Sequence, residues 1–197
     1  MQPTNTEAIP SLEIEKKLSK VRSGAFSNFP KLFHGACVSD FFESYNYSFD
    51  DSVFIIGKCG TGKTHLAIAM MKKAYIDSIQ KGMEYPNVAG LFYNFQDISI
   101  KIKSAFKSDS DSMQDVIRPL LSPAPRIIDD ICTAKPTETA IEALYCVVNY
   151  RYENMLSTIY TTNLWLSEIA QQYGDRIASR LSACRMIMLN GKDRRQK

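Results

Sequence analysis

One eight-residue stretch has the residue types and the spacing of a phosphate-binding loop. It reads Gly57-Lys58-Cys59-Gly60-Thr61-Gly62-Lys63-Thr64 and fits every fixed position of the pattern G-x-x-x-x-G-K-[ST]. The glycines of such a loop let the backbone turn tightly and direct its N–H groups at phosphate oxygens. The lysine reaches the β- and γ-phosphates, and the hydroxyl residue binds Mg²⁺. We therefore expect this stretch to bind a nucleoside triphosphate, with Lys63 on the phosphates and Thr64 on the metal.

The segments on both sides of the loop support this prediction. Residues 52–56 form an apolar run of the kind found in buried parallel strands. Leu66, Met70 and Ala74 follow the loop at helical spacing. A strand, a glycine-rich loop and a helix in this order are the context that the motif requires. His65 falls on the first helical turn and completes the expected nucleotide-binding stretch, residues 57–65.

A second candidate site is the pair of carboxylates in the stretch Arg126-Ile127-Ile128-Asp129-Asp130-Ile131. An apolar strand that ends in carboxylates is typical of the magnesium-binding strand of nucleotide hydrolases. We expect Asp129 to hold Mg²⁺, directly or through water, and Asp130 to orient the attacking water. An acidic turn after a strand is the alternative. Because the two carboxylates lie downstream of a phosphate-binding loop, we favour the magnesium-binding interpretation.

These residues need a scaffold, and the hydrophobic pattern predicts one. Strands are expected at 52–56, 90–94, 126–131, 157–161 and 184–189. Helices are expected at 12–21, directly after the loop, and at 96–107, 113–121, 166–173 and 175–183, with another that starts at a capping box of Thr139 and Glu142. Strands that alternate with helices form a parallel sheet covered on both faces.

Composition limits the class of protein. The 197 residues suffice for one well-buried domain, and no apolar run is long enough to span a bilayer. The five cysteines are scattered and form no C-x-x-C pair, which favours reduced thiols in the cytoplasm over a zinc site or disulfides. We expect residues 1–30 to be a flexible or short helical segment, and residues 31–197 to form the domain.

The net charge is only +3, but the basic residues are unevenly distributed. They gather near the C-terminal end, at Arg176, Arg180, Arg185, Lys192, Arg194, Arg195 and Lys197. Two interpretations stay open: a solvated surface, or a contact with a polyanion.

Several stretches together resemble a known family. They resemble the AAA+ ATPase core of bacterial replicative helicase loaders of the DnaC and DnaI type, and of the closely related IstB transposition ATPases. The matching stretches are 60–67, 127–131, 150–152, 158–164 and 174–181, with Gly191-Lys192 behind them. The likeness extends from about Phe33 to the C-terminus. It implies an AAA+ P-loop NTPase fold, a three-layer αβα sandwich around a five-stranded parallel sheet. The chain stops soon after the last strand, so no helical lid domain is expected.

The resemblance also implies roles for single residues. Asn163 matches sensor 1, the residue that reports on the γ-phosphate. The alternative is an ordinary polar residue at the end of a strand. Arg180 matches the arginine finger, which acts on ATP bound to a neighbouring subunit; Arg176 is the weaker candidate. Asp130 stands where many AAA+ proteins have Glu, so hydrolysis is expected to be slow without a partner or DNA.

The function implied by the resemblance is a Mg²⁺-dependent ATPase of DNA replication that loads or remodels a replicative helicase. A transposition helper of the IstB type is the alternative, with a transposase as partner. A nucleotide-gated scaffold with little turnover is a third candidate, and the segment around Arg180 argues against a P-loop kinase. Single-stranded DNA is an expected partner through Lys101, Lys103 and Lys107, which lie opposite an apolar helical face; a solvated helix surface is the alternative.

Overall fold

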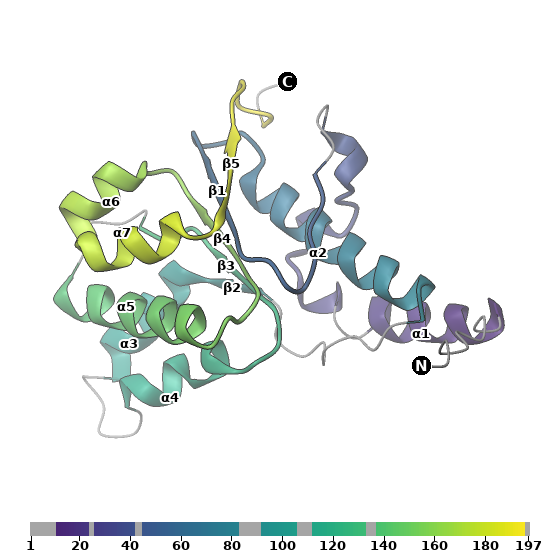
Figure 1. Ribbon diagram of the computed structural model, residues 1–197, viewed down its shortest axis with the longest axis horizontal. Coiled ribbons are helices and arrows are strands. Elements are labelled where there is room, and N and C mark those ends of the chain that lie inside the picture. The colour runs from purple at the N-terminus through teal and green to yellow at the C-terminus, as the bar shows by residue number, and fades with distance from the viewer. Residues whose placement is uncertain are drawn as a thin grey trace, which may run out of the picture.

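A parallel five-stranded β-sheet forms the centre of the computed structural model (Figure 1). The structure describes residues 11–23, 26–41, 45–82, 92–105, 112–132 and 137–195. The strands are β1 (Val53–Gly57), β2 (Phe92–Asn94), β3 (Arg126–Asp129), β4 (Thr158–Thr162) and β5 (Arg185–Leu189). Their order across the sheet is β2-β3-β4-β1-β5, and every pairing is parallel. This confirms the predicted sheet, with β1 in its interior and β5 at an edge.

Helices connect the strands, as parallel pairing requires. The α-helices are α1 (Ser11–Ser23), α2 (Lys63–Gln80), α3 (Phe95–Ala105), α4 (Met113–Ile117), α5 (Glu138–Glu153), α6 (Leu166–Tyr173) and α7 (Asp175–Ser182). Short 3₁₀ helices are η1 (Phe26–Asn28), η2 (Lys31–Phe33), η3 (Val38–Asp40) and η4 (Arg118–Leu121). Among the described residues, no helix has the length and apolar character needed to cross a membrane.

Two hydrophobic cores flank the sheet, because successive strand residues point to opposite faces. In β1, Val53 and Ile55 pack with α2 in one core, whereas Phe54 and Ile56 pack with residues of α3, α5, α6 and α7 in the other. Figure 1 shows α1 and α2 on one side of the sheet and α3 to α7 on the other. The three-layer αβα sandwich predicted from the sequence is therefore present.

The element boundaries agree with the predicted ones to within a few residues, with two differences. The N-cap of α5 is Thr137, whose side chain accepts a hydrogen bond from the Ala140 amide, so the capping box at Thr139 and Glu142 was wrong. Phe26 and Phe29, expected in a flexible or short helical segment, are buried in the same core as α2. The predicted domain boundary after residue 30 falls beside this packed segment and stays a prediction.

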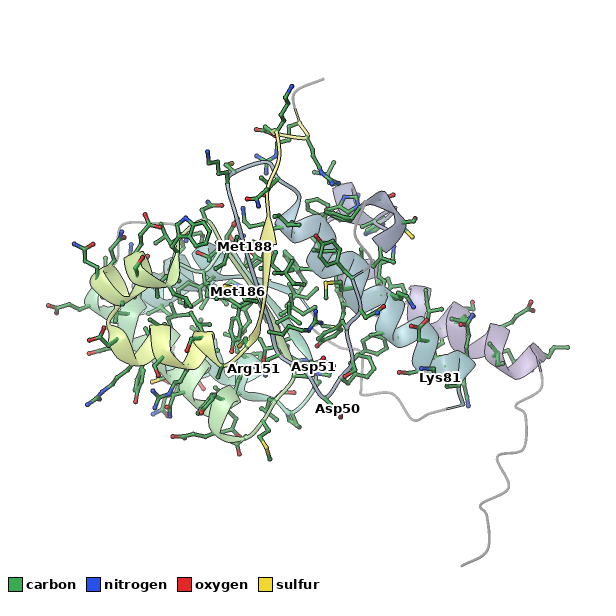
Figure 2. The ribbon with its side chains drawn as sticks, turned by 45° about the horizontal axis from the view of Figure 1, so that its top comes forward. Asp50, Asp51, Lys81, Arg151, Met186 and Met188 are labelled. Carbon is green, nitrogen blue, oxygen red and sulfur yellow. The ribbon has the colours of Figure 1, made fainter. Side chains whose placement is uncertain are left out.

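A buried arginine holds the end of the sheet opposite the phosphate-binding loop (Figure 2). Arg151, in the last turn of α5, is 1% exposed, and its Nε donates to the hydroxyl of Thr158 at 2.6 Å. Its two terminal nitrogens donate to the carbonyl groups of Leu120, Ser122, Ala124 and Ser157. Burial lowers the pKa of this guanidinium to about 10. One side chain thus joins α5, the segment after η4 and the start of β4.

Replacing Arg151 with Met should destabilise the domain by at least about 3 kcal/mol, since each buried acceptor left unpaired costs about 1–3 kcal/mol. Urea denaturation without nucleotide measures the effect. Arg118→Met is the matched control, because Arg118 is exposed and its ion pair with Asp115 lies on the surface. Equal unfolding midpoints for the two variants would contradict this account of Arg151.

Candidate nucleotide-binding site

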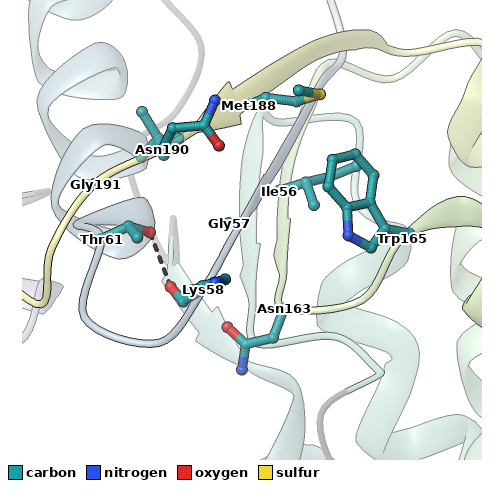
Figure 3. A pocket seen from close by; sticks show the side chains of 10 residues that line it. Ile56, Gly57, Lys58, Thr61, Asn163, Trp165, Met188, Asn190 and Gly191 are labelled. Atoms are coloured by element: carbon teal, nitrogen blue, oxygen red, sulfur yellow. Dashed lines mark hydrogen bonds between the residues drawn. The ribbon is translucent and has the colours of Figure 1, made fainter.

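The parallel register brings the predicted phosphate- and metal-binding residues to the end of the sheet where the strands terminate. Ile56 pairs with Thr162, and Gly57 pairs with Leu189, so β1, β4 and β5 end side by side. Asp129 is the last residue of β3, and Asn163 directly follows β4. A cavity of about 180 Å³ opens at this edge (Figure 3). Its lining includes Lys58, Asn163, Trp165 and Met188.

The phosphate-binding loop requires glycine at two positions for identifiable reasons. A Cβ atom on Gly57 would lie 2.6 Å from the carbonyl oxygen of Leu189 and 2.8 Å from the hydroxyl of Thr61. Gly60 has a φ of 78°, a left-handed conformation that side chains disfavour. Gly57 therefore allows β5 to approach closely, and Gly60 allows the loop to turn toward α2.

The ammonium group of Lys63 is the best-anchored part of the site. The side chain begins α2 and is only 6% exposed. Its Nζ donates to the carbonyl of Gly57 at 2.9 Å, the carbonyl of Lys58 at 3.0 Å and Oδ1 of Asn163 at 2.5 Å. Burial lowers the pKa of this ammonium, and the negative charge of Asp130 opposes that shift. Lys63 and Asn163 are thus brought together, as the sensor 1 assignment requires.

Asp129 and Thr64 converge as the metal prediction requires. The Thr64 hydroxyl donates to Oδ1 and Oδ2 of Asp129, at 2.9 and 3.1 Å, and the Thr161 hydroxyl donates to Oδ1 at 2.7 Å. Burial raises the pKa of Asp129 to about 6, while the Thr161 hydrogen bond acts in the opposite direction. Mg²⁺ takes oxygen ligands and usually needs only one or two from the protein, with phosphates and water completing its shell. Thr64 and Asp129 fit this chemistry.

Asp130 has an unusual backbone conformation next to this pair. Its φ is 53°, which is uncommon for any residue other than glycine. The Asp130 amide donates to the Thr161 hydroxyl at 2.9 Å, and Gln96 Nε2 donates to the Asp130 carbonyl at 3.3 Å. These bonds fix the backbone while the side chain stays half-exposed. Such strain is typical of functional positions, but the role of Asp130 in orienting water stays a prediction.

His65 contacts a different part of the chain from the rest of the loop. Its Nε2 lies 2.6 Å from Oδ2 of Asp40, and its ring packs edge-on against Phe33 and Phe41. The imidazole therefore holds the η2–η3 segment against the first turn of α2. A contact between His65 and a nucleotide stays a prediction.

The C-terminal residues Asp193, Arg194 and Arg195 lie on the loop, which the sequence interpretation did not foresee. The Arg194 amide donates to the Gly60 carbonyl at 3.0 Å, and Nη1 of Arg195 lies 3.9 Å from Sγ of Cys59. The only sequence signal was the basic cluster near the end of the chain. Periodicity could not reveal this contact, because it joins segments more than 130 residues apart.

Arg180 lies at the opposite end of the sheet from the loop. It lines a cavity with Asp50 and Ser52, which precede β1, so the five residues of β1 separate it from the loop, about 16 Å at 3.3 Å per residue. Its Nε donates to Oδ1 of Asn149 at 2.5 Å, and its guanidinium lies over the rings of Tyr145 and Tyr152. Arg180 is therefore not part of the nucleotide site of its own chain.

The lysines predicted to contact DNA are only partly described. Lys101 and Lys103 are exposed on α3, whereas Ile98 and Ile102 on the same helix are buried. Lys107 lies outside the described residues. Their contact with DNA stays a prediction.

Fold and site together define a P-loop nucleotide-binding protein with an AAA+ type core. The chain belongs to the family described as IstB-like ATP binding protein, whose model matches residues 39–192. It is 28% identical over 122 residues to the uncharacterized protein YqaM of Bacillus subtilis (strain 168). That match covers 60% of this chain and 36% of YqaM, so the chain spans little more than a third of that relative.

Solved structures show the same fold. The DnaC helicase loader superposes with a TM-score of 0.63 at 21% identity, over 82% of this chain and 100% of that chain. A protein from Streptococcus pyogenes serotype M3, described provisionally as a primosome component, gives a TM-score of 0.58 at 23% identity. That match covers 85% of this chain and 92% of the other. Both neighbours support the predicted AAA+ core.

Asp129→Asn should stabilise the metal-free protein at pH 7.5. Because the pKa of Asp129 is raised from 3.8 to about 6, its stabilising contribution is complete below about pH 4 and is lost as the pH rises through 6. A shift of this size corresponds to about 2–3 kcal/mol. Thermal melts between pH 4 and 8 should therefore show a flatter profile for Asp129→Asn than for the wild type.

The same variant should lose the extra stabilisation that Mg²⁺ with ATP gives the wild type. Asp130→Asn is the control for metal binding, since it removes the neighbouring carboxylate but keeps the Thr64–Asp129 pair, and it should keep the stabilisation by Mg²⁺ with ATP. An Asp129→Asn protein that is less stable than wild type at pH 7.5, yet still responds to Mg²⁺, would refute the assignment.

Proposed function

We propose that this protein is a Mg²⁺-dependent ATPase that couples ATP binding and hydrolysis to assembly on DNA or on a partner protein. The observation that carries the proposal is the convergence of Lys63, Thr64, Asp129 and Asn163 at one edge of the sheet. Membership of an ATP-binding family supports ATP as the nucleotide. The reaction needs phosphate binding, a metal ligand and a residue that orients water, and each has a candidate here.

Each residue of the site has a separate role in ATP binding and hydrolysis. The loop amides and the Lys63 ammonium bind the phosphates, while Thr64 and Asp129 hold Mg²⁺, which neutralises charge on the phosphate oxygens. Asp130 orients the attacking water with its half-exposed carboxylate. Asn163, bonded to Lys63, places an amide beside the γ-phosphate. The backbone bonds that fix Asp130 set the direction of its side chain before the reaction starts.

For the partner, we propose a replicative helicase that the protein loads or remodels in the cytoplasm. The similarity to the DnaC helicase loader over all of that chain supports this choice. A transposition helper is the second candidate, favoured by the IstB-like family description. Pull-down from the host distinguishes them: a hexameric helicase supports the first, and a transposase supports the second.

We propose further that Arg180 acts on ATP bound to a neighbouring copy. Its position at the far end of β1 prevents it from reaching the loop of its own chain. Its stacking on Tyr145 and Tyr152 is worth about 0.5–1 kcal/mol at an exposed site, so a stronger contact with a phosphate can replace it. A finger supplied by another subunit stabilises charge on the γ-phosphate and contributes about 10³–10⁵ in rate.

The test is hydrolysis as a function of protein concentration. Wild-type specific activity should rise with concentration, whereas Arg180→Ala should bind ATP normally and show no rise. Arg176→Ala is the matched control on the same helix and should behave as the wild type.

Mixing two inactive variants gives a sharper result. Arg180→Ala keeps its nucleotide site, and Lys63→Ala keeps its Arg180, so the mixture should recover part of the activity. Concentration-independent turnover that survives Arg180→Ala would contradict the proposal. An absence of turnover with DNA and partner present would favour a nucleotide-gated scaffold, and a phosphorylated product would favour a kinase.

We propose that Lys101 and Lys103, which are exposed on α3, contact single-stranded DNA together with Lys107, which lies outside the described residues. The triple Lys→Ala variant should bind DNA more weakly and show a salt slope reduced by up to about 2, at about 0.7 per phosphate contact. A triple variant at Lys16, Lys20 and Lys81 removes equal charge from the opposite side of the sheet and serves as control. Equal salt slopes for the two triple variants would refute this contact.

A further inference from the structure

The residues after β5 form a short strap across the phosphate-binding loop. The strap is defined as residues 193–195, which follow Gly191 and Lys192 at the end of β5. Its backbone is fixed by the hydrogen bond from the Arg194 amide to the Gly60 carbonyl at 3.0 Å. The carboxylate of Asp193 occupies the space beside Gly60, where a Cβ atom would lie 2.0 Å from Oδ1. The strap and the loop are therefore packed in direct contact.

A second anchor holds the strap on its other side. The guanidinium of Arg194 lies 4.2 Å from the centre of the Phe41 ring, and its Nη1 donates to the Asp40 carbonyl at 3.3 Å. Its Cδ lies 3.3 Å from where a Cβ on Gly62 would be. Arg194 is thus engaged by the segment before β1, which leaves the neighbouring arginine to face the loop.

Arg195 brings a positive charge to the phosphate-binding loop. Its Nη1 lies 3.9 Å from Sγ of Cys59, a loop residue. The Asp193 carboxylate accepts from the backbone amide of Arg195 at 2.9 Å. None of the ion pairs found among the described residues includes Arg195. Burial is the main cause of the lowered pKa of Lys63; the positive charge of Arg195 acts in the same direction, and the charges of Asp130 and Asp129 oppose it.

Lys63 and Arg195 both contact the loop, Lys63 at the Gly57 and Lys58 carbonyls and Arg195 at Cys59. A polyphosphate bound on the loop would therefore attract both cations. The strap contacts Cys59 and Gly60 of the loop itself, whereas the α3 lysines proposed to meet DNA project from another helix. Arg194 and Arg195 thus lie at the loop, where a bound polyphosphate would sit, rather than on the face of α3.

We propose that Arg195 is a further nucleotide-binding residue, which the strap holds against the loop so that its guanidinium contacts the polyphosphate beside Lys63. This inference rests on the proposed ATP-binding function and assigns a residue to that same site. Asp193 and Arg194 act as positioning residues, because their contacts fix the strap and leave the Arg195 side chain directed at the loop.

The experiment is equilibrium binding of ATP and of inorganic tripolyphosphate, which lacks base and sugar, at constant ionic strength. Arg195→Ala should weaken both ligands by the same factor, about tenfold, as expected for loss of one charge-assisted hydrogen bond. Arg195→Lys should recover part of the loss, since it restores the charge without the guanidinium geometry. Lys192→Ala removes an exposed charge next to the strap and should stay within about twofold of wild type.

A truncation after Lys192 provides an independent variant and should match Arg195→Ala in its loss of tripolyphosphate binding. Unchanged or tighter binding by the truncated chain would overturn the proposal and would mean that the strap covers the loop. A loss of DNA affinity in Arg195→Ala, with tripolyphosphate binding unchanged, would also overturn it. Failure of the wild type to bind ATP or tripolyphosphate would instead refute the proposed function, and the assignment of Arg195 with it.

Discussion

The nucleotide site depends on the parallel register of β1 between β4 and β5. That register places the end of β1 beside the ends of its neighbours, so the loop, Asp129 and Asn163 meet without long connections. It also forces β5 so close to the loop that a side chain at Gly57 would collide with the Leu189 carbonyl. Sheet packing and the phosphate-binding motif therefore both require glycine at position 57. The Lys63 ammonium then joins the loop to the end of β4 through three hydrogen bonds.

At Asp129, the arrangement that would suit a metal ion costs stability in the metal-free protein. Its carboxylate is buried and accepts from two threonine hydroxyls, yet its pKa is raised because burial outweighs those bonds. A buried carboxylate kept near a lysine and a hydroxyl is poorly suited to a stable core but well suited to a cation with few protein ligands. The opposite end of the sheet also buries a charged side chain, Arg151. Its hydrogen bonds all go to neutral hydroxyl and carbonyl oxygens.

The sequence was sufficient to predict the features that depend on local residue patterns. The phosphate-binding motif, the acidic end of β3 and the alternation of strands and helices predicted the sheet and most of the residues that meet at the candidate site, since each follows from residue spacing. The sequence was insufficient where distant segments meet. The cap of α5 at Thr137, the burial of Phe26 and Phe29, and the contact of Arg194 with Gly60 depend on tertiary packing that no periodicity records. The basic residues near the C-terminus are evident in the sequence, but only the fold shows that Arg194 and Arg195 lie on the loop.

The central claim is that this edge of the sheet binds the phosphates of ATP through Lys63. Isothermal titration of the wild type and of Lys63→Ala with ATP, each with and without Mg²⁺, tests it most directly, with thermal melts to confirm that both proteins are folded. The account predicts that the wild type binds ATP more tightly when Mg²⁺ is present, and that Lys63→Ala loses ATP binding while remaining folded. A folded Lys63→Ala protein that binds ATP with wild-type affinity would contradict it.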